Sequence, residues 1–164
     1  MEDARQPVMS WAVSKADWAE AARFFARVLA ADPAYISHGE IQAGLSLDGK
    51  TWAPNLEKRF LDELGEYDDP RRLAIARNAA GEIVAAANVT WAFEVPEAPF
   101  ATLQDLAVEP SLRSAGLGAS LFQFVEAEVS RRAPDGCSSR AGKAMFVRTI
   151  SSSVSDFPRC RTFS

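Results

Sequence analysis

Two glycines, one arginine and the expected start of a helix lie between Val108 and Gly118. The first turn of a helix has backbone N–H groups without partners and a partial positive charge. Gly116 and Gly118 lack side chains, so a phosphate group could approach those N–H groups closely. Arg113 adds a fixed positive charge and a forked set of donors. The segment therefore suits a pyrophosphate held mainly by the backbone.

Two other phosphate-binding motifs do not fit this segment. A nucleotide P-loop ends in Gly-Lys-Ser/Thr, whereas Gly118 is followed by Ala119 and Ser120. A dinucleotide fingerprint needs three glycines in an early parallel βαβ unit. The glycine pair alone also suits a tight turn with close packing of helix on sheet, so the spacing by itself leaves both interpretations open.

Two helices are expected ahead of this segment. Ser14 and Asp17 form a capping-box-like start, and apolar residues then recur at helical spacing until Asp32-Pro33 ends the helix. A second helix is predicted from Pro54 to Leu64, because proline suits the first helical turn. The glycine-containing stretch from Tyr35 to Thr51 reads as an irregular connection.

The spacing of apolar residues changes after these helices, from the period of a helix to that of a strand. The runs Arg72 to Arg77 and Ile83 to Phe93 predict two strands around a turn at Gly81, and Phe100 to Val108 predicts the next strand. A helix from Gly116 to Arg131 follows. The order indicates an α/β domain of the α+β type, covering residues 1–164. Its central sheet is mixed, mainly antiparallel and flanked by helices.

Composition excludes several classes of protein. The net charge of −4 argues against general binding of nucleic acid, which needs clustered Lys and Arg. No apolar run is long enough to span a membrane. His38 is the only histidine, and Cys137 and Cys160 have no metal-ligand spacing, so no metal site is expected. The N-terminus does not resemble a secretory signal, so we expect a cytoplasmic protein.

The pattern Val108-x-Pro110-x-x-Arg113-x-x-Gly116-Leu117-Gly118-x-x-Leu121 resembles the signature of the GNAT superfamily of N-acetyltransferases. The resemblance extends roughly from Val8 to Arg132 and implies acetyl-coenzyme A as cofactor. It implies that the main chain near Leu106, Ala107 and Val108 binds the pantetheine arm, as an added strand would. The residues implied for the pyrophosphate are Arg113, Ser114, Ala115, Gly116, Leu117, Gly118 and Ala119.

Transfer of an acyl group to an amine needs a neutral nucleophile and a donor to the thioester carbonyl. The resemblance implies a backbone N–H near Leu106 as that donor, and a carboxylate, or a water held by one, as the base. Asp105 is the first candidate, with Glu94 and Glu109 as alternatives. Gln104 alternates with Asp105 along the strand, so the strand register decides which of them faces the cleft.

The segment from Ala133 to Ser164 departs from the family pattern. Lys143 to Ile150 predicts one further strand, but the C-terminal strands of the family are otherwise missing. The tyrosine that the family uses to protonate the leaving thiolate has no counterpart, because Tyr35 and Tyr67 lie far upstream. The segment is an altered C-terminus, a short variant completed by a partner subunit, or a disordered extension. An open sheet edge would favour a homodimer.

These patterns predict an N-acetyltransferase that moves an acetyl group from acetyl-coenzyme A to a primary amine of a small molecule or protein. The alternative is a non-catalytic module that binds acyl-coenzyme A. The acidic chain suits a cationic acceptor, whereas the sequence does not identify that acceptor.

Overall fold

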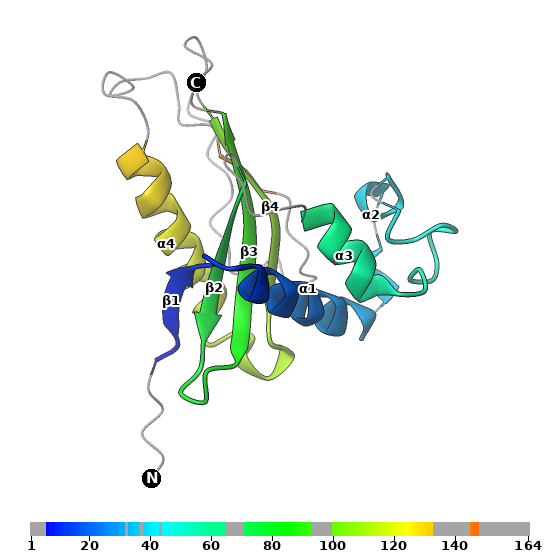
Figure 1. Cartoon of the computed structure of the whole chain (residues 1–164), viewed down its shortest axis with the longest axis horizontal. Helices are drawn as coiled ribbons and strands as arrows, with labels where there is room; N and C mark the ends of the chain where they lie inside the picture. Colours follow the sequence, from blue (N-terminus) through cyan, green and yellow to red (C-terminus); the bar gives the residue numbers. More distant parts are fainter. Residues whose placement is uncertain are drawn as a thin grey trace.

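A computed structural model describes residues 6–31, 33–36, 38–42, 44–64, 71–92, 100–132 and 145–147 (Figure 1). Within these ranges the strands form one sheet in the order β1-β2-β3-β4-β5. Strands β1 to β4 pair antiparallel, and β5 pairs parallel with β4. The predicted mixed, mainly antiparallel sheet flanked by helices is therefore confirmed. The elements are β1 (Val8–Trp11), α1 (Lys15–Ala30), η1 (Pro33–Tyr35), α2 (His38–Gln42), α3 (Leu56–Leu64), β2 (Arg71–Arg77), β3 (Ile83–Ala92), β4 (Phe100–Val108), η2 (Pro110–Leu112), α4 (Leu117–Arg132) and β5 (Met145–Val147).

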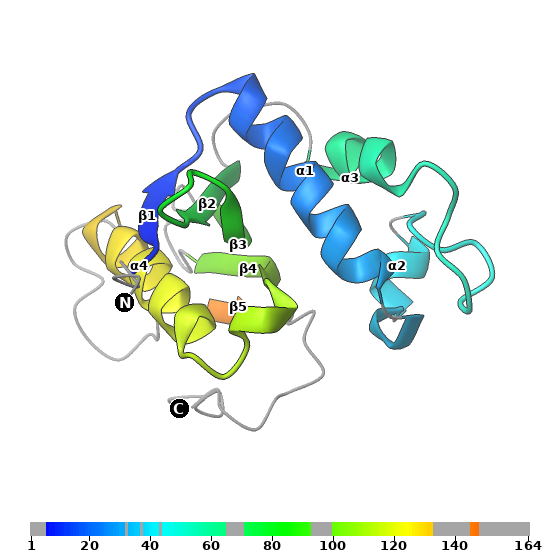
Figure 2. The same cartoon turned by 90° about the horizontal axis from the view of Figure 1, so that it is seen from below.

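Helices cover both faces of the sheet, with α4 on one side and α1 and α3 on the other (Figure 2). The strand residues divide between two buried clusters, as the alternation of side chains in a strand requires. Leu73, Ile75 and Ala86 join the cluster of α1 and α3, whereas Ala74 and Ala87 join that of α4. The alanine-rich run in β3 therefore forms the predicted strand, and its small side chains on both faces let the helices pack closely.

Helix α1 begins with the predicted capping box. The Asp17 N–H donates to Ser14 Oγ at 3.1 Å, and the Ser14 N–H donates to Asp17 Oδ2 at 3.2 Å. Arg77 of β2 forms ion pairs with Asp17 at 3.0 Å and with Glu20 at 2.7 Å. Burial raises the pKa of Asp17, but hydrogen bonds from Val13, Ser14 and Arg77 outweigh it and lower that pKa below its ordinary value. The first turn of α1 is thus held on the sheet.

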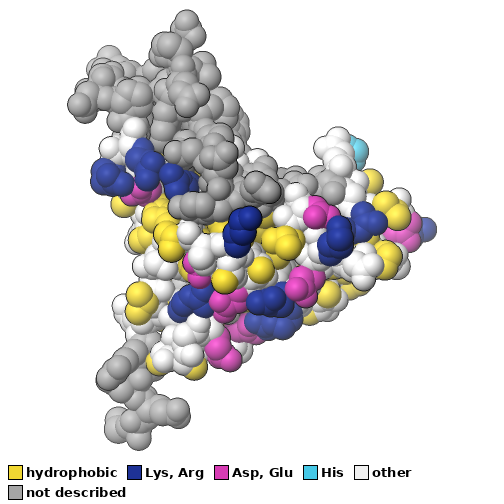
Figure 3. Space-filling model, in the orientation of Figure 1, with side chains coloured by type: hydrophobic (Ala, Val, Ile, Leu, Met, Phe, Trp, Pro, Cys, Tyr) yellow, Lys and Arg dark blue, Asp and Glu magenta, His cyan; other side chains and the backbone are white. Residues whose placement is uncertain are grey.

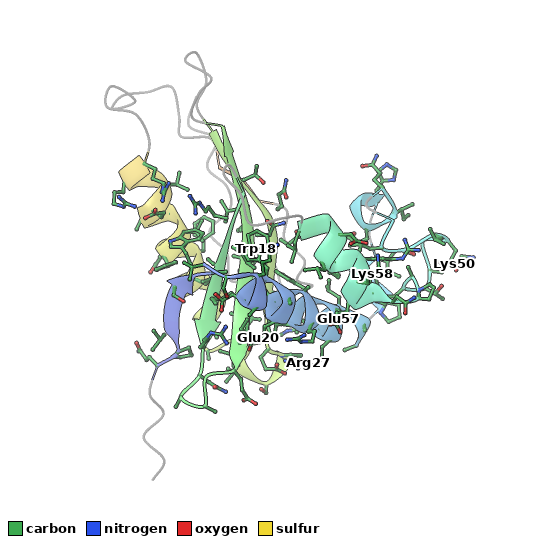
Figure 4. The ribbon with its side chains drawn as sticks, in the orientation of Figure 1. Trp18, Glu20, Arg27, Lys50, Glu57 and Lys58 are labelled. Carbon is green, nitrogen blue, oxygen red and sulfur yellow. The ribbon has the colours of Figure 1, made fainter. Side chains whose placement is uncertain are left out.

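The helices α1 and α3 also contact each other over a charged surface. Arg23 of α1 lies 3.8 Å from Glu57 of α3, and both side chains are exposed. Figure 4 shows Glu57 from α3 and Glu20 and Arg27 from α1 on this side of the molecule. Basic and acidic side chains are intermingled over the same face in Figure 3. This face therefore shows no extended patch of a single charge.

Two short elements were not predicted, and one predicted helix begins later than expected. Strand β1 was not predicted, because its four residues are too few for a period to show. The stretch from Tyr35 to Thr51 contains the short helix α2, and α3 begins at Leu56 rather than Pro54. Strand β5 lies inside the predicted Lys143–Ile150 strand, and the rest of the C-terminal segment lies outside the described residues. No described helix combines the length and apolar character that a membrane span requires.

Candidate active site

The turn between β4 and α4 is built by a sequence of short hydrogen bonds. The Glu109 N–H donates to the Val84 carbonyl at 2.8 Å, which continues the pairing of β4 with β3 by one residue. Pro110 then begins the single turn η2, in which the Leu112 N–H donates to Glu109 O at 2.9 Å. Proline suits this position because it has no N–H to leave unpaired. The chain leaves the sheet here and turns towards α4.

Two residues of this turn adopt left-handed backbone conformations. Ser114 has a φ of 70° and Gly116 a φ of 77°. The left-handed region is strained for a residue with a Cβ, so Ser114 carries a cost of about 1 kcal/mol that the turn must offset. A Cβ added at Gly116 would meet no atom within 4 Å. Gly116 is therefore favoured by its backbone conformation, and the space in front of it is open.

The first turn of α4 faces this open space. The Ser120 N–H donates to Gly116 O at 3.0 Å, and this bond closes the first turn. The N–H groups of Leu117, Gly118 and Ala119 precede this bond. They belong to the first turn of the helix, where backbone N–H groups have no carbonyl partner within the helix. Leu117 anchors the turn because its side chain is buried in the α4 cluster. The arrangement agrees with the predicted start of the helix near Gly116 and can bind an anion.

An ion pair ties this turn to α1. Arg27 Nη2 lies 2.7 Å from Glu109 Oε2, and the Arg27 guanidinium also lies 5.5 Å from the centre of the Phe24 ring. The Glu109 side chain is 22% exposed. Glu109, an alternative for the base, is thus engaged by α1, and the sequence could not show this contact between residues 82 positions apart.

The outer edge of β4 is partly unpaired in the described structure. The described residues of β5 pair with Ala101, Thr102 and Leu103. From Asp105 to Val108, β4 pairs with β3 on one side and has no strand partner on the other side among the described residues. The main chain of Leu106, Ala107 and Val108 therefore offers an edge to an extended ligand. The side chains of Leu106 and Ala107 are buried on opposite faces.

A β-bulge interrupts β4 at Gln104. Asn88 pairs with Asp105 and Val89 pairs with Leu103, so Gln104 is the extra residue. Leu103 and Leu106 both join the α4 cluster although they are three positions apart, which only the bulge permits. The expected alternation of Gln104 and Asp105 was therefore wrong: the two side chains contact the same partner.

That shared partner is Asn88 of β3. Asn88 Nδ2 donates to Asp105 Oδ2 at 3.1 Å and to Gln104 Oε1 at 3.3 Å. Asn88 lies in register beside Ala86, whose side chain packs against α1, so this polar group lies on the sheet face opposite α4. Sequence reasoning missed Asn88, although an asparagine within an apolar strand was a usable signal.

Other predicted residues contribute less to this region. Glu94 lies outside the described residues, as do both cysteines. His38 is exposed, with its Nε2 3.2 Å from Gln42 Nε2, as expected for a surface histidine. Within the described ranges, no group of three or more His, Cys, Asp or Glu side chains is arranged to hold a metal ion. Of the predicted bases that the structure describes, Asp105 lies in the part of β4 whose outer edge has no described strand partner.

Both the sequence and the fold of the chain resemble those of known proteins. A sequence profile described as the acetyltransferase (GNAT) family matches residues 41–145, which is more than half of the chain. No curated protein matches the sequence. The matched span includes the β4 edge, the turn at Gly116 and helix α4.

Several solved structures share the fold. A transcriptional regulator from Bacillus halodurans C-125 aligns with a TM-score of 0.56 at 18% identity, over 87% of this chain and 81% of that chain. An acetyltransferase from Vibrio fischeri aligns with a TM-score of 0.53 at 16% identity, over 87% and 96%. A ribosomal-protein-alanine N-acetyltransferase from Brucella melitensis biovar Abortus 2308 aligns with a TM-score of 0.53 at 14% identity, over 96% and 84%. At these identities the likeness concerns the fold.

Proposed function

The chain belongs to the acetyltransferase (GNAT) family, and on that premise we propose that it transfers an acetyl group from acetyl-coenzyme A to a primary amine. The amine belongs to a small molecule or to a protein. One observation carries the proposal: the edge of β4 that has no strand partner among the described residues leads directly into the first turn of α4, whose N–H groups could bind an anion. Coenzyme A has a matching order of groups: an extended pantetheine arm, which suits a strand edge, followed by a pyrophosphate, which suits the N-terminal turn of a helix.

The residues present fit this ligand. Main-chain groups of β4 from Leu106 to Val108 would pair with the amide groups of pantetheine, in the manner of strand addition. The open space at Gly116 and the N–H groups of Leu117 and Gly118 would receive the pyrophosphate. Arg113 supplies positive charge beside them. Ser114 and Ala115 shape the turn, and Ala119 contributes a further N–H.

The protein's own groups would have two roles in the reaction: to polarise the thioester carbonyl and to accept a proton from the amine. Acetyl-coenzyme A supplies an activated thioester, and a β4 main-chain N–H beside Asp105 would polarise its carbonyl. Asp105 would accept the proton that the amine nitrogen loses. The thiol of coenzyme A is a moderately acidic group, with a pKa of about 8.5 for a comparable cysteine, so it leaves as a thiolate without a dedicated acid.

Two measurements test the proposal. Acetyl-coenzyme A at about 100 times its Kd should stabilise the protein by about 2.7 kcal/mol, which corresponds to a rise in Tm of roughly 5–10 °C. Thioester consumption should then be measured over a panel of amines. Stabilisation without turnover on any amine would favour a non-catalytic module that binds acyl-coenzyme A. The absence of any thermal shift would refute both functions.

A further inference from the structure

A buried asparagine stands beside the predicted base on the face of the sheet opposite α4. Asn88 is 1% exposed, and its neighbours in β3 from Ile83 to Val89 are apolar and buried. Burying an amide costs about 1–3 kcal/mol unless it is fully hydrogen-bonded. Gln104 and Asp105, which contact it, are only partly buried. The amide therefore lies directly beneath two partly exposed polar side chains on this face of the sheet.

The contacts of Asn88 fix the orientation of its amide. Asn88 Nδ2 lies 3.1 Å from Asp105 Oδ2 and 3.3 Å from Gln104 Oε1. Both partner atoms accept hydrogen bonds, so the donating nitrogen must face them. Asn88 Oδ1 consequently points away from both. That oxygen is buried and accepts no hydrogen bond from the residues that the structure describes.

An amine acceptor bound beside Asp105 would supply the missing donor. A neutral primary amine has one lone pair and two N–H groups. With the lone pair directed at the thioester carbonyl, one N–H can reach the Asp105 carboxylate and the second can reach Asn88 Oδ1. A secondary amine has a single N–H and can satisfy only one of these two acceptors. A secondary amine would leave the buried Asn88 Oδ1 without a donor, which is costly, so the secondary amine is disfavoured as a substrate.

We infer that Asn88 is a positioning and specificity-determining residue for the acceptor. Its Nδ2 aims the Asp105 carboxylate, and its Oδ1 takes the second N–H of a primary amine. The inference rests on the proposed function. As the N–C bond forms, the nitrogen gives one proton to Asp105, the C–S bond breaks and coenzyme A leaves as a thiolate. Asn88 exchanges no proton and acts by orientation.

The test compares two substrates on the full chain. The probes are the fastest primary amine of the panel, for example Nα-acetyl-lysine, and the same amine carrying one N-methyl group. Asn88→Leu has a similar volume without donor or acceptor. We expect it to keep the thermal shift with acetyl-coenzyme A and to lose about 10- to 100-fold in kcat/KM for the primary amine. The ratio of primary to N-methyl amine should fall about tenfold.

Control variants separate orientation from folding. Thr90→Val removes a second polar side chain on the same strand, whose buried Oγ1 accepts from no described group, and it should keep the wild-type ratio. Asn88→Ala provides a second loss variant with the same expected ratio if Asn88→Leu does not fold. An unchanged ratio in the folded Asn88 variants, or an equal fall in Thr90→Val, would overturn the inference about Asn88 alone. A wild-type protein that acetylates no amine would instead overturn the proposed function and this inference with it.

Discussion

Replacing Gly116 by glutamate should abolish tight binding of coenzyme A. Gly116 has a φ of 77°, and a Cβ there would point into open space in front of the first turn of α4. The substitution therefore has two separate consequences. The backbone is strained in the free and bound protein alike, and a carboxylate is placed where the pyrophosphate is proposed to lie.

The two consequences differ in size and in readout. A residue with a Cβ at this φ costs about 1 kcal/mol, which lowers Tm by about 2–4 °C in a chain of this length. One carboxylate at about 5 Å from two pyrophosphate charges costs about 1.7 kcal/mol even at the dielectric constant of water. Affinity for coenzyme A should therefore fall at least about tenfold, as measured by calorimetric titration. Acetyl-pantetheine, which has no pyrophosphate, should bind equally to both proteins.

Gly81 offers a matched control in another turn. It lies between β2 and β3 with a φ of 85°, and a Cβ there also meets no atom within 4 Å. Gly81→Glu should lower Tm by a similar amount and leave the affinity for coenzyme A unchanged. Gly116→Gln keeps the side-chain length without the charge and should bind more tightly than Gly116→Glu. Wild-type affinity in a folded Gly116→Glu protein would refute the pyrophosphate assignment.

Three further changes test separate parts of the structure. Asp105→Asn keeps an oxygen for the Asn88 hydrogen bond, so it should retain the thermal shift with acetyl-coenzyme A while kcat falls about 100-fold or more; near-wild-type turnover would show that Asp105 is not the base. Ser14→Ala removes the side-chain acceptor for the Asp17 N–H and should lower the free energy of unfolding by about 1 kcal/mol in a denaturant titration, whereas an unchanged midpoint would contradict the capping role. Hydrogen bonds from the Thr51 N–H, the Lys50 N–H and the Thr51 hydroxyl lower the pKa of Asp48 to about 2. Its stabilising contribution is complete above its unfolded pKa of about 3.9 and is lost as pH falls through about 2. Asp48→Asn should therefore flatten the dependence of Tm on pH between about 4 and 2, and an identical slope would refute this assignment.

Much of the framework could be predicted because it depends on local signals. The Ser14 capping box, the strand Phe100–Val108 and the start of α4 near Gly116 all follow from caps, alternation and turn residues within a few positions. Strand β1 could not be predicted in this way. It has four residues, and its place at the sheet edge depends on pairing with β2, for example Val8 with Arg77.

The sequence allowed the proposed cofactor turn and Asp105 to be named as candidates, but it did not show the contacts that surround them. The turn proposed for the pyrophosphate is continuous in sequence, so its glycines and arginine were visible together. The contact of Asn88 with Asp105 joins two strands, and the pair of Arg27 with Glu109 joins a helix to a turn. Such contacts depend on strand register and helix docking, which no local pattern specifies. The bulge that brings Gln104 beside Asp105 is equally a product of pairing.

The bulge at Gln104 lies where the described pairing of β4 changes on both of its sides. Before it, β4 pairs with β5 through Ala101 to Leu103; after it, the outer edge of β4 is free among the described residues. The extra residue also shifts the alternation, so that Leu103 and Leu106 both stay beneath α4 while Asp105 turns to the opposite face. Among the described residues, the pairing with β5 and the interruption of the β3 pairing therefore meet at Gln104. Deleting Gln104 would restore regular pairing with Leu103 still opposite Val89 and Asp105 still opposite Asn88, so both side chains would keep their faces and Asn88 Nδ2 would lose one of its two acceptors. The bulge therefore affects the proposed chemistry through the contact of Gln104 with Asn88, and not through the face that Asp105 occupies.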